Sequence, residues 1–484
     1  MCGFIGIAGL PGRDIAPELY EGLIALQHRG QDAAGILSFD GAFHLRKGEG
    51  MVRDIFSAAD MARLKGNLAV GHVRYPTVGG GGSQDAQPFY INYPFGVGMA
   101  HNGNLTNFVD LKEAQFPKEN ICLESSCDVE AILYAFAMGL QRTLRKDPLE
   151  HRIRTAVENV FERVKGAYSV GGVLAEGVLF GFRDPSGIKP CIVGRRVTEE
   201  GEEWAVASES VAFDVLGFEK VRDLENGEAF FVVPGQEPRF VRVAEGPHTP
   251  CIFELVYFAR PDSFLDGISV YKARQRFGEA LARQWRDEGA PTPDVVIPIP
   301  DSARDAALSM ALELGVPYRE GFIKNRYVGR TFIMPNQAAR QDSIRRKLNP
   351  IPIEFEGRRV LLVDDSIVRG NTSRKIVETA RRAGAKEIYF ASTSPPLISP
   401  CPYGIDMATR EDFVARGRTV EEVRELIGAD YLTYLELDRM VEAAQAPNGE
   451  VEGFCTGCFT GRYPTEDAAA SLDVIAAERA AMRV

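Results

Sequence analysis

The first half of the chain alternates short apolar segments with polar turns. The apolar runs are residues 168–174, 178–182 and 229–233. Turn-forming residues separate them, such as Asp-Pro-Ser-Gly at 184–187, and short strands bounded in this way are typical of a layered sheet domain. A helix is expected at residues 128–140, which follow a pair of serines. Residues 234–250 are polar and turn-rich, which indicates a domain boundary.

The second half alternates strand-like and helix-like segments. Apolar residues recur at the spacing of one helix face over 307–314, and Gly315 follows them as a helix-ending residue. The expected strands are residues 295–299, 360–363 and 388–391, and a second expected helix is 373–382. Strands that alternate with helices predict a parallel sheet covered by helices. The alanine-rich tail after Glu466 is expected to be helical.

Length and composition are those of a globular protein with more than one domain. The chain has 484 residues, of which 45% are hydrophobic and 25% charged, as in ordinary soluble proteins. We expect a domain at 2–235, a second at 250–465 and a helical tail at 466–484. The net charge of −11 argues against nucleic acids and anionic membranes as partners, because both attract basic surfaces.

The chain shows no sign of a membrane or secretory segment. No apolar run reaches the roughly 18 residues that a membrane-spanning helix needs. Arg13 follows the apolar start instead of preceding it, which is the wrong order for a signal peptide. A cytoplasmic location is therefore expected. Reducing conditions there disfavour disulfides, so metal binding or catalysis is favoured for the eight cysteines.

Cys2 follows the initiator methionine and would combine two reactive groups once Met1 is removed. An α-amino group has a pKa of about 8, so a fraction of it is unprotonated at neutral pH and can act as a base. The thiol of the same residue would be the nucleophile. Position alone also allows an incidental cysteine, and other segments favour the catalytic interpretation.

Three further segments carry groups that suit amide chemistry. Arg74 precedes a proline-fixed turn, and its guanidinium can hold a carboxylate through two hydrogen bonds. Asn102 and Gly103 supply a side-chain amide and a backbone N–H side by side, as an oxyanion hole requires. Asp128 offers a carboxylate for an ammonium group. Taken singly, each has a plainer explanation: Arg74 as a surface arginine, Asn102 and Gly103 as a turn, and Asp128 as a helix N-cap.

Together these segments resemble the class II glutamine amidotransferase family, whose domain has an αββα fold and an N-terminal nucleophile. The motifs that carry the resemblance are CGFIG at 2–6, LQHRGQD at 26–32, GHVRY at 71–75, HNGN at 101–104 and SCD at 126–128. The resemblance implies that Cys2 attacks the side-chain amide of glutamine and forms a thioester. It also implies that Asn102 and Gly103 form the oxyanion hole, while Arg74 and Asp128 bind the α-carboxylate and α-amine of glutamine.

A phosphate-binding loop is the strongest local signal in the second half. An apolar strand ends in Asp364 and Asp365, and a loop containing Gly370 then leads into a helix. Backbone N–H groups at a helix start bind phosphate, and two acids beside them can accept hydroxyl groups or approach Mg²⁺. The loop lacks the Gly-Lys-Ser/Thr of a Walker loop. The alternative is a solvated turn with an acidic cap.

This loop resembles the signature for phosphoribosyl pyrophosphate (PRPP) in type I phosphoribosyltransferases, which have a parallel-sheet α/β fold. The resemblance implies ribose hydroxyls at Asp364 and Asp365. The implied cradle for the 5-phosphate is Ser366, Ile367, Val368, Arg369, Gly370, Asn371, Thr372 and Ser373. Asn371 departs from the usual Thr or Ser, which a site built on backbone groups should tolerate. Residues 298–303 resemble the pyrophosphate loop, which implies PRPP contact by Asp301 and a Mg²⁺ site of Ser302 with the two acids.

Residues 324–347 are strongly basic in an otherwise acidic chain. The basic residues are Lys324, Arg326, Arg330, Arg340, Arg345, Arg346 and Lys347, against the single acid Asp342. Such a run is either a solvated face or a lid whose charge offsets that of pyrophosphate. Residues 325–335 resemble the flexible loop of the amidophosphoribosyltransferase family, which implies PRPP contacts from Lys324 and Arg330.

Four cysteines stand in contexts that suit a metal centre. Cys455 and Cys458 form a C-x-x-C pair, and Cys251 and Cys401 each follow a proline. Four thiolates suit zinc or a 4Fe–4S cluster, and spacing alone does not choose between them. One branch of the amidophosphoribosyltransferase family has cysteines in these four contexts, which implies one 4Fe–4S cluster per subunit on Cys251, Cys401, Cys455 and Cys458. The other cysteines outside the Cys2 site, Cys122, Cys127 and Cys191, are expected to be buried.

The two resemblances cover nearly the whole chain and together imply one reaction. Glutamine, PRPP and water would give 5-phosphoribosylamine, pyrophosphate and glutamate, the first committed step of purine synthesis, with one Mg²⁺ per subunit. Purine nucleotides are implied as feedback inhibitors, and a homotetramer as the assembly. The alternatives are another class II amidotransferase, such as glucosamine-phosphate synthase, and a regulator that only senses PRPP.

Overall fold

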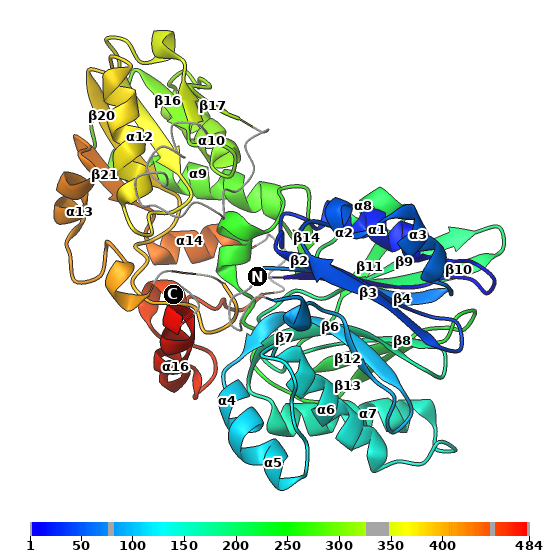
Figure 1. Ribbon diagram of the computed structural model, residues 1–484. Coiled ribbons are helices and arrows are strands. Elements are labelled where there is room, and N and C mark those ends of the chain that lie inside the picture. The colour runs from blue at the N-terminus through cyan, green and yellow to red at the C-terminus, as the bar shows by residue number, and fades with distance from the viewer. Residues whose placement is uncertain are drawn as a thin grey trace.

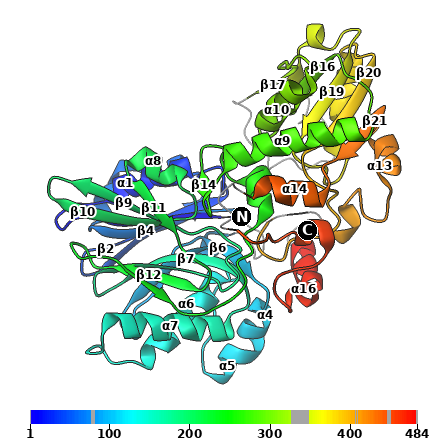
Figure 2. The same cartoon turned by 180° about the vertical axis from the view of Figure 1, so that it is seen from behind.

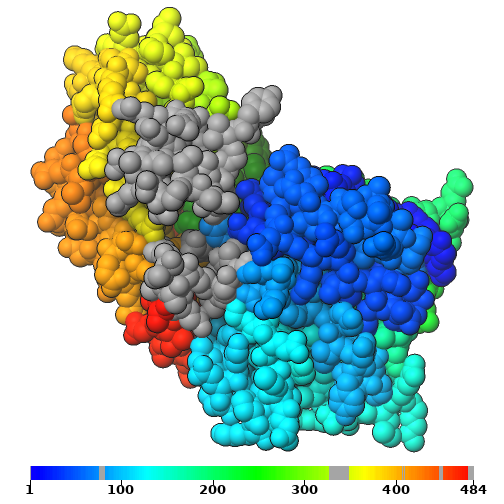
Figure 3. Space-filling model, in the orientation of Figure 1, coloured from blue at the N-terminus to red at the C-terminus, as the bar shows by residue number. Residues whose placement is uncertain are grey.

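The computed structural model describes residues 2–75, 82–325, 348–405, 407, 409–445 and 451–481. The first half of the chain forms one lobe and most of the second half forms another (Figure 1). The same two lobes are seen from their surface in Figure 3. Among the helices so described, none is long and apolar enough to cross a membrane.

The first lobe is built on two stacked antiparallel sheets. One sheet contains, among the described residues and in spatial order, β11 (Glu219–Asp223), β9 (Ile192–Thr198), β10 (Gly201–Ala207), β1 (Gly3–Ala8), β4 (Leu68–Arg74), β2 (Ala33–Phe39) and β3 (Phe43–Glu49). The other contains β13 (Arg239–Arg242), β12 (Glu228–Val232), β8 (Val178–Arg183), β7 (Gly166–Leu174), β6 (Val97–Leu105) and β5 (Phe89–Ile91). Phe4, Leu37, Val70, Leu179 and Phe230 pack between the two sheets. Because β13 pairs with β12, this sheet extends beyond residue 235.

Helices cover the outer faces of both sheets (Figure 1). The first sheet carries α1 (Ala16–Ala25), α2 (Val52–Ile55), α3 (Ala58–Arg63) and α8 (Val211–Leu216). On the side of the second sheet lie α4 (Phe108–Asp110), α5 (Phe116–Lys118), α6 (Val129–Gln141) and α7 (Leu149–Arg163). Phe136 of α6 stacks on Phe180 and Phe182 of β8. The four layers confirm the expected αββα architecture and the helix predicted at 128–140.

The second lobe contains the expected parallel sheet. Its described strands are, in spatial order, β16 (Val295–Pro298), β19 (Arg359–Asp364), β20 (Glu387–Ser392) and β21 (Tyr431–Tyr434), all parallel. Its helices are α9 (Val270–Asp287), α10 (Arg304–Leu314), α12 (Asn371–Arg382), α13 (Val420–Ile427) and α14 (Leu437–Ala444). The small hairpins are β14 (Phe264–Leu265) with β15 (Ile268–Ser269), and β17 (Phe322–Lys324) with β18 (Leu348–Pro350). Helix α12 begins two residues before the predicted 373, because Gly370 caps it in a left-handed conformation with φ of +72°.

The C-terminal segment returns to the first lobe. It contains α15 (Gly457–Thr460) and the tail helix α16 (Ala468–Ala481), so the helix expected after Glu466 is present. Figure 2 shows α16 beside the first lobe, away from the parallel sheet. The Thr106 hydroxyl donates to Asp467 at 2.5 Å, which ties the end of β6 to the start of this tail.

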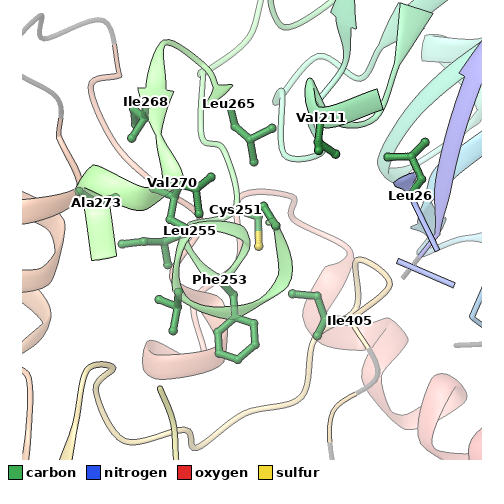
Figure 4. Packing of buried hydrophobic residues seen from close by; sticks show 14 of the residues in the cluster. Leu26, Val211, Cys251, Phe253, Leu255, Leu265, Ile268, Val270, Ala273 and Ile405 are labelled. Carbon is green, nitrogen blue, oxygen red and sulfur yellow. The ribbon is translucent and has the colours of Figure 1, made fainter. Parts of the chain in front are cut away.

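Two buried arginines of the first lobe reach across the junction between the lobes. Arg29 donates to Glu254 at 2.8 Å, and Arg183 binds Asp266 with both terminal nitrogens, at 2.5 and 3.0 Å. An apolar cluster surrounds this junction, and Figure 4 shows that it includes Leu26 together with Phe253 and other residues of the second half. The junction is therefore both apolar and ion-paired.

Candidate active site

Cys2 lies at the entrance to the central strand β1 and is only 7% exposed. Its backbone N–H donates to Asn102 Oδ1 at 3.4 Å, and its Sγ lies 3.8 Å from the carbonyl oxygen of Tyr75. Tyr75 directly follows β4, the neighbour of β1. The pairing of these strands with one another thus fixes the position of the thiol.

Asn102 and Gly103 lie at the end of β6, where they face β7. The side chain of Asn102 is fully buried, and its Nδ2 has no hydrogen-bond partner among the residues that the structure describes. A buried donor without an acceptor is costly, and such a donor can stabilise negative charge that develops beside it. Gly103 has φ of +152°, and a Cβ placed there would be 2.0 Å from the carbonyl oxygen of Ala167. Only glycine fits at this position.

The two residues expected to bind the α-groups of glutamine are both buried and lie in polar networks. Arg74 Nη2 is 3.6 Å from Asp85, which also accepts hydrogen bonds from Ser126. Asp128 accepts from the Leu105 N–H at 3.0 Å and lies 3.2 Å from His101 Nε2. Burial alone would raise the pKa of Asp128, but His101 and the Leu105 N–H hold it below its ordinary value.

Arg29 connects the Cys2 site with the junction between the lobes. Its Nε donates to the carbonyl oxygen of Cys2 at 3.0 Å, and its terminal nitrogens bind Glu209 and Glu254. Against the effect of burial, these carboxylates raise the pKa of Arg29 above its ordinary value. The fully buried guanidinium also lies 4.8 Å from the centre of the Phe258 ring. Arg29 belongs to the motif at 26–32, but no local pattern indicates its partners, which lie far away in the chain.

The acid pair lies at the carboxyl end of β19, where parallel α/β sheets bind their ligands. Asp364 and Asp365 are 9% and 7% exposed. Burial and the neighbouring Asp365 raise the pKa of Asp364 well above its ordinary value. Burial likewise raises the pKa of Asp365, although the hydroxyls of Ser302 and Ser366 donate to it. Two neighbouring buried carboxylates repel each other when both are ionised. They therefore favour binding of a cation or of hydroxyl donors beside them.

A cavity of about 590 Å³ lies between the acid pair and the Cys2 site. Its lining residues are His28, Arg29 and Tyr75 of the first lobe, Phe253, Tyr257, Phe258, Ile299, Pro300, Ser302, Ile405 and Met407, and the loop residues Asp364, Asp365, Ser366, Val368, Arg369, Gly370, Thr372 and Ser373. Tyr75 belongs to this wall and also contacts the Cys2 thiol. The cavity therefore has the acid-pair loop in its wall and extends to a neighbour of the Cys2 thiol, although Cys2 itself does not line it.

The other predicted PRPP residues that the structure describes are not among those that line this cavity, although Ile367, Asn371 and Asp301 are chain neighbours of lining residues. Ile367 is 1% exposed and packs in the core beneath the loop, and Asn371 is the exposed first residue of α12. Asp301 accepts a hydrogen bond from Lys324 Nζ at 2.8 Å, with both side chains about half exposed. Arg330 lies outside the described residues.

The four cysteines of the expected metal centre come together in one buried region. Cys251 and Cys455 pair as an isolated β-bridge, with the Cys455 N–H donating to the Pro250 carbonyl at 2.9 Å. Cys458 is buried, and its carbonyl accepts from the N–H groups of residues 398 and 399, just before Cys401. Burial raises the pKa of Cys251 to about 12, and the neighbouring Cys401 adds to the rise.

The four thiols lie close enough to influence one another, since Cys251, Cys455 and Cys401 add to the rise that burial gives the pKa of Cys458. Within the described ranges, no three His, Cys, Asp or Glu side chains are grouped so that they could hold a metal ion. Zinc would draw four sulfurs to about 2.3 Å from a single centre, whereas the larger 4Fe–4S cube leaves its cysteines farther apart. Both centres take four thiolates, so metal analysis is needed to distinguish them.

The expectation for the other cysteines is corrected at one position. Cys127 and Cys191 are buried as predicted, but Cys122 is exposed. Cys122 precedes Leu123 in the polar connection between α5 and α6, where Leu123 is the buried residue. Asp85 and Glu209 escaped prediction because their partners lie far away in the chain. Tyr75 was visible only as part of the motif at 71–75, without its contact to the Cys2 thiol.

Comparisons with known proteins agree with both halves of the site. A glutamine amidotransferase domain family matches residues 78–215, and a phosphoribosyl transferase domain family matches residues 270–394. The amidophosphoribosyltransferase of Pseudomonas aeruginosa is 48% identical over 470 residues, which are 96% of this chain and 93% of that protein. The amidophosphoribosyltransferase of Saccharomyces cerevisiae is 45% identical, covering 96% of this chain and 92% of its own.

A solved structure extends the comparison to three dimensions. The glutamine PRPP amidotransferase of B. subtilis, complexed with ADP and GMP, matches with a TM-score of 0.84 and 37% identity, covering 96% of this chain and 98% of that one. Relatives this similar span the full length of both lobes in bacteria and yeast. The chain therefore belongs to the amidophosphoribosyltransferase family.

Proposed function

We propose that Cys2 releases ammonia from glutamine and that the central cavity delivers it to PRPP held at the acid-pair loop. The products are 5-phosphoribosylamine, pyrophosphate and glutamate. The observation that carries the proposal is the single cavity whose wall includes both Tyr75, which contacts the Cys2 thiol, and the loop from Asp364 to Ser373.

In the first step, removal of Met1 frees the α-amino group of Cys2, which takes the thiol proton. The sulfur then attacks the amide carbon of glutamine, and the resulting oxyanion accepts hydrogen bonds from Asn102 Nδ2 and the Gly103 N–H. Ammonia leaves with the proton from the base, and water hydrolyses the thioester to glutamate. Arg74 and Asp128 hold the α-carboxylate and α-amine, and the unpartnered Nδ2 of Asn102 supports this assignment.

In the second step, the residues around the acid pair orient PRPP for attack at its anomeric carbon. Asp364 and Asp365 accept the ribose hydroxyls, and the backbone of residues 366–373 receives the 5-phosphate at the start of α12. Asp301, Lys324 and Arg330 surround the pyrophosphate. Ser302 and the two acids would hold one Mg²⁺, which offsets pyrophosphate charge when bound. The raised pKa values of the acid pair support a site that is completed by a cation.

The wall of the cavity suits the passage of uncharged ammonia. Phe253, Phe258 and Ile405 contribute apolar side chains. Ammonium must shed a proton before it can act as a nucleophile, and these apolar side chains disfavour the charged form, although Arg29 and the acid pair also line the cavity. Delivery through this cavity thus keeps the nitrogen reactive at neutral pH.

We further propose that Cys251, Cys401, Cys455 and Cys458 hold one 4Fe–4S cluster with a structural or oxygen-sensing role. Their joint burial and their origin in distant segments support it. Protein purified without oxygen should contain about four iron atoms per chain and a broad visible absorbance that bleaches in air. Stoichiometric zinc without iron would contradict the cluster.

Regulation, assembly and location complete the proposal. The ADP and GMP in the B. subtilis relative support purine nucleotides as inhibitors. We propose a homotetramer in the cytoplasm, and the mass in solution by light scattering tests the assembly. A mass of one or two chains would contradict the tetramer.

The central experiment follows both products at once. With glutamine, PRPP and Mg²⁺, glutamate and pyrophosphate should appear in a 1:1 ratio, as coupled transfer requires. A class II amidotransferase for another acceptor would form glutamate without pyrophosphate release. A PRPP sensor would form neither product. Either result would contradict the proposed reaction.

A further inference from the structure

The oxyanion strand of the first lobe is contacted by a segment nearly 300 residues later in the chain. Asn104, two residues after Asn102, donates from its Nδ2 to the carbonyl oxygen of Pro402 at 2.9 Å. Asn104 is 3% exposed. A hydrogen bond this well buried fixes the two segments relative to each other, because breaking it leaves a polar group without a partner.

Gly404 makes a second contact with the same strand. A Cβ placed on Gly404 would lie 2.6 Å from the carbonyl oxygen of Gly103 and 3.4 Å from the Cβ of Asn104. Gly404 has φ of +93°, a region that side chains rarely adopt. Its backbone therefore lies directly on the Gly103–Asn104 peptide, an approach that no larger residue permits.

The segment that makes these contacts is itself firmly held. The Tyr403 hydroxyl accepts from the Thr465 N–H at 3.1 Å, and the Tyr463 hydroxyl donates to the Pro400 carbonyl at 2.6 Å. Gly103 lacks a side chain, so its peptide planes rotate more easily than those of its neighbours. The pairing of Gly103 with Tyr168 of β7 already restricts it. A rigid contact on its carbonyl side adds to this restraint, and so limits rotation of the preceding peptide, which carries the Gly103 N–H.

We infer that Asn104 and Gly404 are positioning residues of the glutaminase reaction. They brace Gly103 from its carbonyl side, and thereby help to keep its N–H in the orientation that an oxyanion hole needs. The inference rests on the proposed role of Gly103. Neither residue touches the reacting atoms. Their effect is expected on the step in which the oxyanion forms and not on the binding of glutamine.

The test compares two pairs of variants of the full-length protein. Asn104→Leu removes the donor and keeps a similar shape, and Thr106→Val removes a similar bond between the same two regions. Gly404→Ala adds a Cβ against Gly103. Gly417→Ala adds one at a comparable φ of +69°, where no atom lies within 4 Å.

We expect Asn104→Leu and Gly404→Ala to lower kcat with glutamine by about tenfold, part of the 10²–10³ that loss of a whole oxyanion donor costs. The KM for glutamine and the rate with ammonia should stay within about twofold of wild type, a split that a merely structural change would not produce. Thr106→Val and Gly417→Ala should retain wild-type values.

Two results would overturn the inference: a kcat of Asn104→Leu equal to that of Thr106→Val, or a raised KM with unchanged kcat. If Gly404→Ala fails to fold, Asn104→Leu decides. An Asn102→Ala variant distinguishes failure of the oxyanion hole from failure of the positioning role. Retained glutamine turnover in Asn102→Ala would refute the proposed oxyanion hole, whereas its loss beside an unaffected Asn104→Leu would refute only the positioning role.

Discussion

Two buried carboxylates show how differently the two sites of this chain are built. Asp128 in the first lobe has a lowered pKa because His101 and a backbone N–H compensate its charge. Asp364 in the second lobe has a raised pKa because its close neighbour, Asp365, is another acid. The first site is thus compensated before substrate arrives, whereas the second holds an excess of negative charge. The difference indicates that ligands complete the second site.

The largest difference between the two sites is expected when Cys2 is replaced. Cys2→Ala should lower the glutamine-dependent rate by about 10³-fold or more, because no other group replaces the nucleophile. The ammonia-dependent rate at high pH should remain within about twofold, since the second lobe is unchanged. Product formation with each nitrogen source measures both effects. Cys191→Ala, at a buried thiol in the same lobe, is the control and should retain both rates.

The second site should lose activity with either nitrogen source when one acid is neutralised. Asp365→Asn should lower the PRPP-dependent rate by roughly 10- to 100-fold, the value of a hydrogen bond to a charged group. Asp294→Asn, at the opposite end of the same sheet where Asp294 pairs with Arg359, is the matched control. A variant at Asp365 that loses only its glutamine-dependent rate would contradict the separation of the two sites.

The shared cavity predicts that the two sites influence each other. PRPP should tighten glutamine binding by about 5- to 10-fold, within the range of ordinary coupling energies. Titration of glutamine onto a Cys2→Ser protein, with and without PRPP and Mg²⁺, measures the effect without turnover. Equal affinities in the two titrations would show that the sites act independently.

The smallest expected effect is on stability. Because the pKa of Asp364 is raised in the folded protein, its ionisation opposes folding as the pH rises above the ordinary value of about 3.9. Without Mg²⁺ and PRPP, Asp364→Asn should raise stability near pH 7.5 by about 1 kcal/mol, or roughly 2–4 °C in melting temperature. The gain should vanish near pH 4. Calorimetry at both pH values tests it, and a gain that persists at pH 4 would contradict this origin.

Local patterns in the sequence predicted most of the fold. The strands at 168–174, 178–182 and 295–299 and the helix at 128–140 match the structure within one or two residues, because short apolar runs and the polar residues that bound them mark such elements. The acid pair was equally visible, since Asp364 and Asp365 directly follow a buried strand.

Contacts between distant segments could not be predicted in this way. No spacing rule links Arg29 with Glu254, or Asn104 with Pro402, because both pairs form only when the lobes dock. The exposure of Cys122 also escaped prediction, because the hydrophobicity of cysteine suggests burial but does not require it. Local sequence patterns thus indicated the helices, strands and motifs. The packing of distant segments determines which polar groups contact one another.

The buried pair of Arg183 and Asp266 has a consequence for recombination between family members. A chimera joined at 235–250 would separate Arg183 from the Asp266 with which it evolved, and Arg29 from Glu254 in the same cut. A mismatched partner at such a site costs about 3–5 kcal/mol. Residues 251–266 should therefore be exchanged together with the first lobe. Chimeras joined beyond Asp266 should keep both ion pairs and fold.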